Sequence, residues 1–554
     1  MAKKNIQVER LDKLTPRDYQ DVAIQRMRAE MDLDNGGTGS VLLADDLGLG
    51  KTLMITEIIR KLKPQKTGLR VLYIGPNVTH LQVKKTLLRQ FPTLPDDKVR
   101  LVGPHGDSGT KYDAETWRRM KKKEPGIFLI GPEHMAGKLG YEVTESGEKR
   151  KWAPTQANIL KGMRDGRVPP WQLTGVWDLV VFDEVHRARN RKDALIGKTL
   201  RLIKGLRKVG ASATPAGNLE EDIWFILNWL WPKLYPSFWD WAEKHFTIHE
   251  DEYGWDSINR CAKTKKVVGK VIDPVAMWGE IPCAIRRLSK DILNLPEVIT
   301  HEIEVGMTLE QREMYDDFEE QCFTWMDEVP VGTPLPIVKQ IRLRQLALGQ
   351  TTATEGVMSL SKAARRQKVT VESLQARIDA GEDVDLTELD VDYKPIDQPK
   401  IYALKEILSD LSLDEPVLVL THSSKFADLV AKKLGKSAVR WPRSSQPELQ
   451  ESVKKGFGTD YRVLVAVISG VGTGTDGLQE KSHVEVWLSQ DQDGVQNEQA
   501  RGRLHRSGQT KPVQRFYVRT AGTIDEDVYA KQLSRGERMS NLYGDTKTPG
   551  QSAR

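Results

Sequence analysis

The sequence predicts an α/β protein with two tandem, doubly wound parallel-sheet lobes and a largely helical insertion between them. The first observation is that short runs of Val, Ile and Leu recur in two separate blocks of the chain. Such runs suit strands buried on both faces of a parallel sheet. The second is that helical or loop stretches separate the runs, as in doubly wound folds. The runs are 41–44, 71–74, 127–130 and 179–182 in the first block, and 417–420, 463–468, 484–488 and 516–518 in the second.

The segment between the two blocks, residues 246–395, differs from them in composition. It is polar, and residues 359–393 are especially rich in charged and small side chains. We interpret it as a solvated helical insertion and linker; the alternative is a protruding element that contacts a macromolecular partner. The predicted domains are therefore 1–245, 246–395 and 396–535, followed by a flexible tail at 536–554.

Bulk composition narrows the class of protein. The chain has 554 residues, which at roughly 100–200 residues per domain allows about three to five structural units. Hydrophobic residues make up 39% and charged residues 29%, as in globular rather than disordered or fibrous proteins. The net charge, 83 minus 77 or +6, permits a nucleic-acid partner without requiring one. The three cysteines lie too far apart for a CxxC-type zinc site or a disulfide framework.

The sequence carries no signal for secretion or for membrane insertion. The N-terminal segment is charged and lacks the apolar stretch of a signal peptide. No window approaches the ~18–20 consecutive apolar residues of a membrane-spanning helix. We therefore expect a cytoplasmic protein that does not enter a membrane.

The segment from Ala44 to Thr52 predicts a phosphate-binding loop, because it lies between an apolar strand and a helical run. Gly48 and Gly50 allow the backbone to turn its N–H groups toward an anion. Lys51 can place its ammonium group on the β- and γ-phosphates, and the Thr52 hydroxyl can bind Mg²⁺. The generic pattern has glycine where this chain has Asp45. A glycine-rich turn with a chance Gly-Lys-Thr is the alternative.

A pair of carboxylates ends the last strand run of the first block. Asp183 follows this run, at a position where a carboxylate can hold Mg²⁺ directly or through water. Glu184 beside it can orient and deprotonate an attacking water. Such pairs are common on protein surfaces, but the phosphate loop in the same block favours a functional pair.

Two arginines provide the strongest signal in the second block. Arg503 and Arg506 are three residues apart and would share one face of a helix. Phosphoryl transfer spreads negative charge over the γ-phosphate oxygens, and an arginine supplied from across a cleft neutralises that charge. A solvated basic helix is the alternative interpretation.

Two further clusters bear on a nucleic-acid partner. One is a basic stretch that could contact phosphates or simply form a solvated helix face. Its members are Lys192, Lys198, Arg201, Lys204, Arg207 and Lys208. The other is a group of tryptophans, which we assign to the core because Ile and Leu residues alternate with them, although bases can also stack on exposed tryptophans. They are Trp224, Trp229, Trp231, Trp239 and Trp241.

In their order along the chain, these motifs resemble those of the superfamily-two helicase-like ATPases, specifically the Swi/Snf type of DNA translocase. The resemblance extends over residues 14–535. Residues 14–20 resemble the Q-type motif of the family, which implies that Gln20 recognises adenine. Residues 183–186, Asp-Glu-Val-His, resemble a DEAH box, and 212–215 resemble the motif that couples hydrolysis to DNA contact. Residues 45–52 resemble an acidic variant of the phosphate loop, which implies nucleotide contacts from Asp46, Gly48, Leu49, Gly50, Lys51 and Thr52.

Other segments favour the Swi/Snf type over DEAD-box or DEAH-box RNA helicases. They are 218–224, 286–291 and 295–296. In the second block, 472–478 and 499–506 resemble motifs V and VI, which implies that Asp476 and Gln499 contact the nucleotide. Motif V departs from the usual leucine–asparagine–leucine pattern, which puts its ribose and backbone contacts in doubt. The sequence shows no bromodomain, chromodomain or zinc module, which favours a compact bacterial or bacteriophage motor.

The resemblance implies two RecA-like lobes that close on ATP and Mg²⁺. Lys51, Asp183, Glu184, Arg503 and Arg506 would then be catalytic, and Thr52 and Asp183 would bind the metal. The expected partner is DNA, with duplex favoured and contacts made mostly to the backbone, independently of sequence. We expect a monomeric motor, with an accessory protein as a further candidate partner. The alternatives are an RNA-directed helicase or ATPase, a binding module with a decayed motor, and the motor subunit of a restriction, defence or replication–repair complex.

Overall fold

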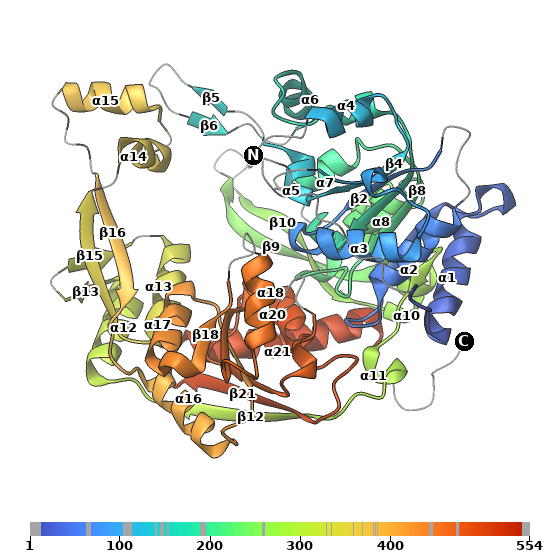
Figure 1. Cartoon of the computed structure of the whole chain (residues 1–554). Helices are drawn as coiled ribbons and strands as arrows, with labels where there is room; N and C mark the ends of the chain where they lie inside the picture. Colours follow the sequence, from blue (N-terminus) through green and yellow to red (C-terminus); the bar gives the residue numbers. More distant parts are fainter. Residues whose placement is uncertain are drawn as a thin grey trace. The chain divides into compact units, whose positions relative to one another are not determined.

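The computed structural model divides the chain into two compact units (Figure 1). Unit 1 comprises Met1–Leu139, Pro154–Asn294 and Ser534–Arg554, and unit 2 comprises Gly140–Ala153 and Leu295–Leu533. The structure describes residues 13–62, 68–102, 114–138, 141–143, 149–151, 155–188, 195–256, 261–327, 329–333, 335–357, 359–367, 369–380, 382, 384, 386–442, 447–471 and 476–545.

Unit 1 is built on a seven-stranded parallel sheet with the strand order β11-β1-β8-β7-β2-β4-β3. Its strands are β1 (Ser40–Leu43), β2 (Arg70–Ile74), β3 (Val99–Val102), β4 (Gly126–Ile130), β7 (Trp177–Asp183), β8 (Gly205–Ala211) and β11 (Ala284–Ile285), and a hairpin of β9 (Phe246–Asp256) and β10 (Cys261–Val271) lies outside the sheet. Its helices are α1 (Asp18–Met31), α2 (Lys51–Lys61), α3 (His80–Gln90), α4 (Ala114–Lys121), α5 (Pro132–Ala136), α6 (Gln156–Arg164), α7 (Leu195–Leu200), α8 (Ile223–Leu230), α9 (Phe238–His245), α10 (Pro274–Gly279) and α11 (Ser289–Ile292).

Unit 2 is built on a six-stranded parallel sheet with the strand order β12-β21-β20-β17-β19-β18. These strands are β12 (Val298–Val305), β17 (Val417–Thr421), β18 (Ala438–Arg440), β19 (Val463–Val467), β20 (Val484–Trp487) and β21 (Val513–Thr520). Three hairpins join β5 (Tyr141–Val143) to β6 (Lys149–Lys151), β13 (Phe323–Met326) to β14 (Val329–Gly332), and β15 (Thr351–Val357) to β16 (Thr387–Tyr393). The helices are α12 (Leu309–Gln321), α13 (Pro336–Leu348), α14 (Leu360–Gln367), α15 (Val371–Asp379), α16 (Pro399–Asp410), α17 (Ser424–Leu434), α18 (Pro447–Gly456), α19 (Ile468–Val471), α20 (Gly494–Arg501) and α21 (Ile524–Tyr543).

The predicted fold class of two parallel-sheet α/β lobes is confirmed. Each of the eight apolar runs overlaps a strand of one of the two sheets. In β7, every residue from Trp177 to Phe182 is buried, because helices cover both faces of a doubly wound sheet. Four of the five clustered tryptophans, Trp224, Trp229, Trp231 and Trp241, are buried in unit 1, as the alternation with Ile and Leu predicts.

The structure differs from expectation in the segment 246–395, where hairpins are as prominent as helices. In Figure 1, α14 and α15 lie beyond the end of the hairpin formed by β15 and β16. These two strands pair antiparallel from Thr351 opposite Tyr393 to Val357 opposite Thr387. In β16, Thr, Leu, Val and Tyr alternate with Glu and Asp, a period-two pattern that is hard to recognise within a segment rich in charged residues.

The C-terminal part of the chain also differs from expectation. The tail predicted to begin at 536 starts inside α21, and Tyr543 at the end of that helix is buried in unit 1. The Tyr543 hydroxyl accepts a hydrogen bond of 3.1 Å from the Ala216 N–H. Residues 546–554 lie outside the described part of the chain. Among the described residues, no helix is long and apolar enough to cross a membrane.

A buried ion pair holds the start of α21 in unit 2. Lys400 on α16 is 1% exposed, and its ammonium group donates to the carboxylate of Asp525 and to the carbonyl oxygens of Leu488, at 2.6 Å, and Val518, at 3.1 Å. Burial lowers the pKa of Lys400, and the charge of Asp525 opposes that change. The pair therefore joins α16, the end of β20, β21 and α21.

We predict that Lys400→Met destabilises unit 2 by about 3–5 kcal/mol, because Asp525 would keep a buried charge without its cation. Lys405→Met is the matched control, since Lys405 pairs with Asp397 at the surface and should contribute only about 0–1 kcal/mol. Urea unfolding followed by hydrogen exchange of the β17 and β20 amides measures both. Equal losses in the two variants would contradict the structural role of the buried pair.

Candidate nucleotide site

Adjacent parallel strands bring the predicted residues of unit 1 to one edge of the sheet. The phosphate loop follows β1, Ser212 follows β8, and Asp183 ends β7. These three strands are neighbours in the order β1-β8-β7, with β11 and β2 on either side. Loops at the carboxyl ends of such strands form the usual ligand crevice of open α/β sheets. The sheet topology therefore gathers residues that are up to about 240 positions apart in sequence.

The phosphate loop owes its shape to two glycines. Gly48 and Gly50 have φ angles of 80° and 78°, in the left-handed region that other residues seldom adopt. A Cβ at Gly50 would lie 2.3 Å from the Gln20 amide nitrogen, so a side chain there would also displace that amide. Helix α2 begins at the next residue, Lys51, and Thr52 is its second residue. The N–H groups of the first helical turn thus follow the loop directly.

Lys51 is held within the loop by uncharged partners. Its ammonium group donates to the carbonyl oxygens of Asp45, at 2.8 Å, and Asp46, at 3.0 Å. An ammonium group bonds more strongly to a charged oxygen than to a carbonyl oxygen. The lysine can therefore exchange these contacts for those of a phosphate.

Gln20 contacts the same loop. Its side chain is 5% exposed, and its amide nitrogen donates 3.0 Å to the Leu49 carbonyl oxygen. The amide oxygen accepts 2.9 Å from the Arg17 N–H, which fixes the orientation of the amide at the start of α1. Tyr19 donates to the same Leu49 oxygen at 3.3 Å. The structure thus brings Gln20 and Leu49 together at the loop.

The two loop aspartates are tied to the segment that follows β11. Asp45 is completely buried and forms a two-pronged ion pair with Arg287, with 3.0 Å between Nε and Oδ1. Asp46 accepts 2.6 Å from the Ser289 hydroxyl and 3.2 Å from the Ser289 N–H. Residues 286–291 resemble a family segment in sequence, but that resemblance does not predict these contacts. The available signal was the acidic loop followed, far along the chain, by two consecutive arginines.

Asp183 is surrounded by groups that make its charge costly. Burial, and then the neighbouring charge of Glu184, raise its pKa from 3.8 to about 6, while Tyr73 and Lys51 oppose the increase. The Tyr73 hydroxyl donates 2.8 Å to Oδ2, and the Glu184 N–H donates 3.1 Å to Oδ1. The sequence analysis did not predict this contact of Tyr73. The only signal for it is that Tyr73 is an aromatic residue in an otherwise aliphatic strand run.

Glu184 adopts an unusual backbone conformation beside two polar residues. Its φ angle is 56°, a strained value for glutamate and one that concentrates at functional sites. Its carboxylate lies 3.1 Å from His186 Nδ1, and that nitrogen lies 2.9 Å from the Ser212 hydroxyl oxygen. The segments 183–186 and 212–215 are therefore in direct contact.

Unit 2 gathers the four predicted residues of the second block. Asp476 binds the guanidinium of Arg506 at 2.5 Å, and it lies 3.6 Å from that of Arg503. Arg503 also donates 3.2 Å from Nε to the Gln499 carbonyl oxygen. The Gln499 amide oxygen is buried and has no hydrogen-bond partner in the described part of the chain. Residues 472–475 of the predicted motif V lie outside that part.

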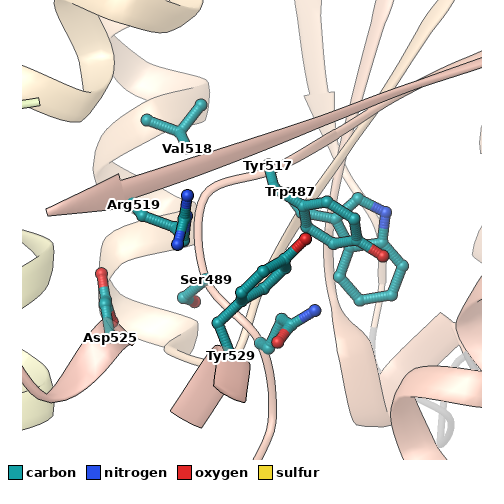
Figure 2. Close-up of a pocket in the computed structure, with 8 residues that line it drawn as sticks. Trp487, Ser489, Tyr517, Val518, Arg519, Asp525 and Tyr529 are labelled. Atoms are coloured by element: carbon teal, nitrogen blue, oxygen red, sulfur yellow. The ribbon is translucent and has the colours of Figure 1, made fainter. Parts of the chain in front are cut away.

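A small hollow in unit 2 lies apart from these residues. Figure 2 shows its lining at the ends of β20 and β21. The lining residues are Trp487, Ser489, Gln490, Tyr517, Val518, Arg519, Asp525 and Tyr529. None of the residues predicted to bind nucleotide is among them.

The basic stretch is only partly available to a partner. Arg207 donates 2.6 Å to the Met31 carbonyl oxygen, and Lys208 donates 2.7 Å to that of Trp229. Arg201 and Lys204 are exposed, and Lys198 is half-buried. Lys192 lies outside the described residues. Among the described residues of this stretch, Arg201 and Lys204 are therefore the ones most available for a phosphate contact.

We predict that Asp183→Asn stabilises unit 1 at pH 7.5 in the absence of nucleotide and metal. Between pH 3.8 and about 6 the folded state keeps a proton that the unfolded chain releases, so this carboxyl destabilises the fold increasingly as pH rises. With the side chain partly open to solvent, we expect a gain of about 1–2 kcal/mol at pH 7.5 and less at pH 5.

Urea unfolding at the two pH values measures this effect. Asp178→Asn is the control in the same strand, because Asp178 is buried and accepts 2.7 Å from the Arg70 N–H. It should destabilise the protein or leave it unchanged. Stabilisation by Asp178→Asn but not by Asp183→Asn would contradict the assignment of Asp183 as the carboxylate whose charge destabilises the fold.

Two family models match the chain. The SNF2-related domain matches residues 164–371, and the res subunit of type III restriction enzymes matches residues 13–217. The chain is 22% identical over 524 residues to the SNF2 domain-containing protein ENL1 of Oryza sativa subsp. japonica, covering 90% of this chain and 49% of that protein. It is 27% identical over 217 residues to the ATP-dependent DNA helicase DDM1 of Arabidopsis thaliana, covering 38% of this chain and 24% of that protein.

A solved structure, the Sulfolobus solfataricus SWI2/SNF2 ATPase core in complex with dsDNA, is 18% identical with a TM-score of 0.35 and covers 96% of this chain and 99% of that one. The chain spans about half the length of the Oryza sativa relative, and its match covers about a quarter of the Arabidopsis thaliana relative. Its sequence relationships agree with the resemblance seen in its motifs. Residues 164–371 of the chain therefore match the SNF2-related domain, and most of the chain is similar in sequence to an SNF2 domain-containing protein.

Proposed function

We propose that this protein is an ATP-dependent DNA translocase that couples hydrolysis of Mg-ATP to movement along DNA. The observation that carries the proposal is the edge of the unit 1 sheet, where the Lys51 loop, Asp183 and Glu184 meet. The charge of Lys51 opposes the increase in the pKa of Asp183, which supports a shared site for the lysine and the carboxylate pair. Phosphoryl transfer needs this combination of a cation for the phosphates, a metal-binding carboxylate and a base.

The residues present fit a magnesium ion and a triphosphate. Burial and then the neighbouring charge of Glu184 raise the pKa of Asp183 to about 6, and a divalent cation would relieve the cost of this negative charge. Thr52 and Asp183 would hold Mg²⁺, and Gly48, Gly50 and Lys51 would hold the phosphates. The metal would supply charge neutralisation on the phosphate oxygens. Gln20, which contacts the loop through Leu49, would recognise adenine.

Glu184 is the group best placed to activate water. Its positive φ angle and its contact with His186 hold the carboxylate in one orientation beside Asp183. From there it would orient a water molecule on the γ-phosphate and take its proton. Because His186 contacts Ser212, a movement of Glu184 and His186 on hydrolysis would also move the segment 212–215.

The arginines of unit 2 would complete the reaction. Asp476 lies against both Arg503 and Arg506 and offsets part of their charge. We propose that the γ-phosphate competes with Asp476 for these guanidinium groups and so favours a closed arrangement of the two units. Hydrolysis removes that competitor, which would allow the units to part and a bound strand to advance.

DNA is the preferred partner because relatives of this chain include an ATP-dependent DNA helicase. Duplex contacts would be made mainly to the backbone and would be largely independent of sequence. The match to a type III restriction subunit favours a second candidate, the motor of a restriction complex that receives its target from an accessory protein. A monomeric state and a cytoplasmic location remain predictions, as does the alternative of an RNA-directed ATPase.

We predict that Lys51→Ala and Glu184→Gln each reduce nucleic-acid-stimulated ATPase activity by at least about 100-fold while the protein stays folded. The expected reasons differ, since Lys51 binds the phosphates and Glu184 acts on water. Glu184→Gln should therefore keep nucleotide affinity, and Lys51→Ala should lose it. Steady-state hydrolysis and binding of a fluorescent ATP analogue separate the two. Near-normal turnover in either variant would refute the assigned roles.

We predict that duplex DNA stimulates hydrolysis more than single-stranded DNA or RNA of equal length. Because the grip is to phosphates, the concentration of DNA giving half-maximal stimulation should rise steeply with salt, by about 10-fold or more between 50 and 200 mM. Hydrolysis assays with the three nucleic acids measure both effects. Stimulation by RNA alone would instead favour the RNA-directed alternative.

A further inference from the structure

The segment that follows β11 runs beside the phosphate loop and continues to pair with it beyond the end of the sheet. Strand β11 pairs in parallel with β1, with Leu43 opposite Ile285. The pairing continues past both strands, since the Ala44 N–H donates 2.7 Å to the Ile285 carbonyl and the Asp46 N–H donates 3.0 Å to the Arg287 carbonyl. The first residues of the loop are therefore fixed by backbone bonds to a segment about 240 positions later.

Side chains strengthen this attachment at Asp45. The carboxylate is completely buried, and both of its oxygens bind the Arg287 guanidinium. The third guanidinium nitrogen of Arg287 donates to the Tyr19 carbonyl oxygen, next to Gln20 on α1. A planar guanidinium held at three points has little freedom to move. Arg287 therefore joins the phosphate loop to the helix that carries Gln20.

Asp46 is attached in the same way through Ser289. One carboxylate oxygen accepts from both the hydroxyl and the N–H of Ser289, at 2.6 and 3.2 Å. The other oxygen accepts 2.8 Å from the Leu47 N–H within the loop. The carboxylate that the family resemblance assigned to the nucleotide is thus engaged by the protein itself.

The same two aspartates position Lys51. Their carbonyl oxygens are the two acceptors of its ammonium group, while their carboxylates face Arg287 and Ser289. Movement of either aspartate would displace the oxygens that hold the lysine. A chain of direct contacts therefore runs from residues 287 and 289 through the aspartates to the lysine.

We propose that Arg287 and Ser289 are positioning residues for nucleotide binding, acting on Lys51 through Asp45 and Asp46. The inference rests on the proposed ATPase function and deepens it. An aspartate in place of the usual glycine puts a buried negative charge at the start of the loop, and Arg287 is its matched cation. Loss of Arg287 would leave that charge uncompensated, and the loop would rearrange to reach solvent or another cation.

The test compares nucleotide affinity in variants of this pair. Arg287→Gln should raise the dissociation constant of a fluorescent ATP analogue about 10-fold or more, and Ser289→Ala, a milder change, about 3-fold. The double variant Asp45→Asn with Arg287→Gln should recover most of the affinity lost in Arg287→Gln, because it leaves no unpaired charge. Free guanidinium at millimolar concentration should partly restore binding to Arg287→Gln.

Arg207→Gln is the matched control, because Arg207 is a unit 1 arginine that donates to a backbone carbonyl away from the loop. Its dissociation constant should stay within about twofold of the natural protein. A merely structural Arg287 would lower the folded fraction without changing the affinity of the molecules that remain folded. The dissociation constant therefore distinguishes positioning from stability, and Ser289→Ala does so in a variant that should fold normally.

Three outcomes would each refute a different part of the proposal. If Lys51→Ala weakens binding but Arg287→Gln and Ser289→Ala match the natural protein, the positioning role is refuted and the proposed ATPase stands. If the natural protein binds no nucleotide in the presence of Mg²⁺, the proposed function itself fails. Weakening by Arg287→Gln without recovery in the double variant would refute the pairing with Asp45 as the cause.

Discussion

Parallel pairing of five neighbouring strands in unit 1 is the constraint on which the candidate site depends. In the order β11-β1-β8-β7-β2, all five carboxyl ends lie along one edge of the sheet. Apart from Gln20, which lies on α1, every group assigned to ATP chemistry in this unit lies on one of these strands or in the segment that follows it. A parallel sheet requires strands buried on both faces, which explains why the apolar runs are so regular in sequence. The requirements of the core thus determine where the polar side chains meet.

Two carboxylates at that edge, Asp45 and Asp183, differ in how their negative charge is compensated. Asp45 has a dedicated partner in Arg287, so its buried carboxylate is compensated whether or not a ligand is present. Asp183 instead accepts hydrogen bonds from the Tyr73 hydroxyl and the Glu184 N–H, both uncharged, and its pKa is raised to about 6. A carboxylate that is paired with a cation suits a structural role. A carboxylate with a raised pKa and uncharged hydrogen-bond donors suits the binding of a metal ion. This contrast separates the acidic residues of the loop from the acidic residues of the strand.

The sequence predicts the parts of the fold in which local pattern and tertiary structure agree. The apolar runs could be recognised because buried parallel strands need little besides Val, Ile and Leu. The hairpin of β15 and β16 could not, because its alternation is short and lies within a segment of charged residues. The contact of Asp45 with Arg287 joins residues 242 positions apart, and no local pattern encodes such a distance. Tyr73 was overlooked because an aromatic residue in a buried strand usually only fills space.

The residues of unit 2 show a different limit of prediction. Arg503, Arg506 and Asp476 were predicted as separate contacts of one ligand, and the structure places them against one another. A motif identifies residue types that a reaction needs, but it does not state what those residues bind when the ligand is absent. The ion pairs with Asp476 mean that nucleotide would have to compete for arginines that already have a partner.

The central claim is that hydrolysis by this chain moves it along duplex DNA. Displacement of a third strand from a triplex, placed downstream on an otherwise intact duplex, measures such movement without requiring the duplex to open. The account predicts displacement with Mg-ATP, with a delay that lengthens as the duplex before the triplex is extended, and none with a non-hydrolysable analogue. Rapid DNA-stimulated hydrolysis with no displacement at any duplex length would contradict it.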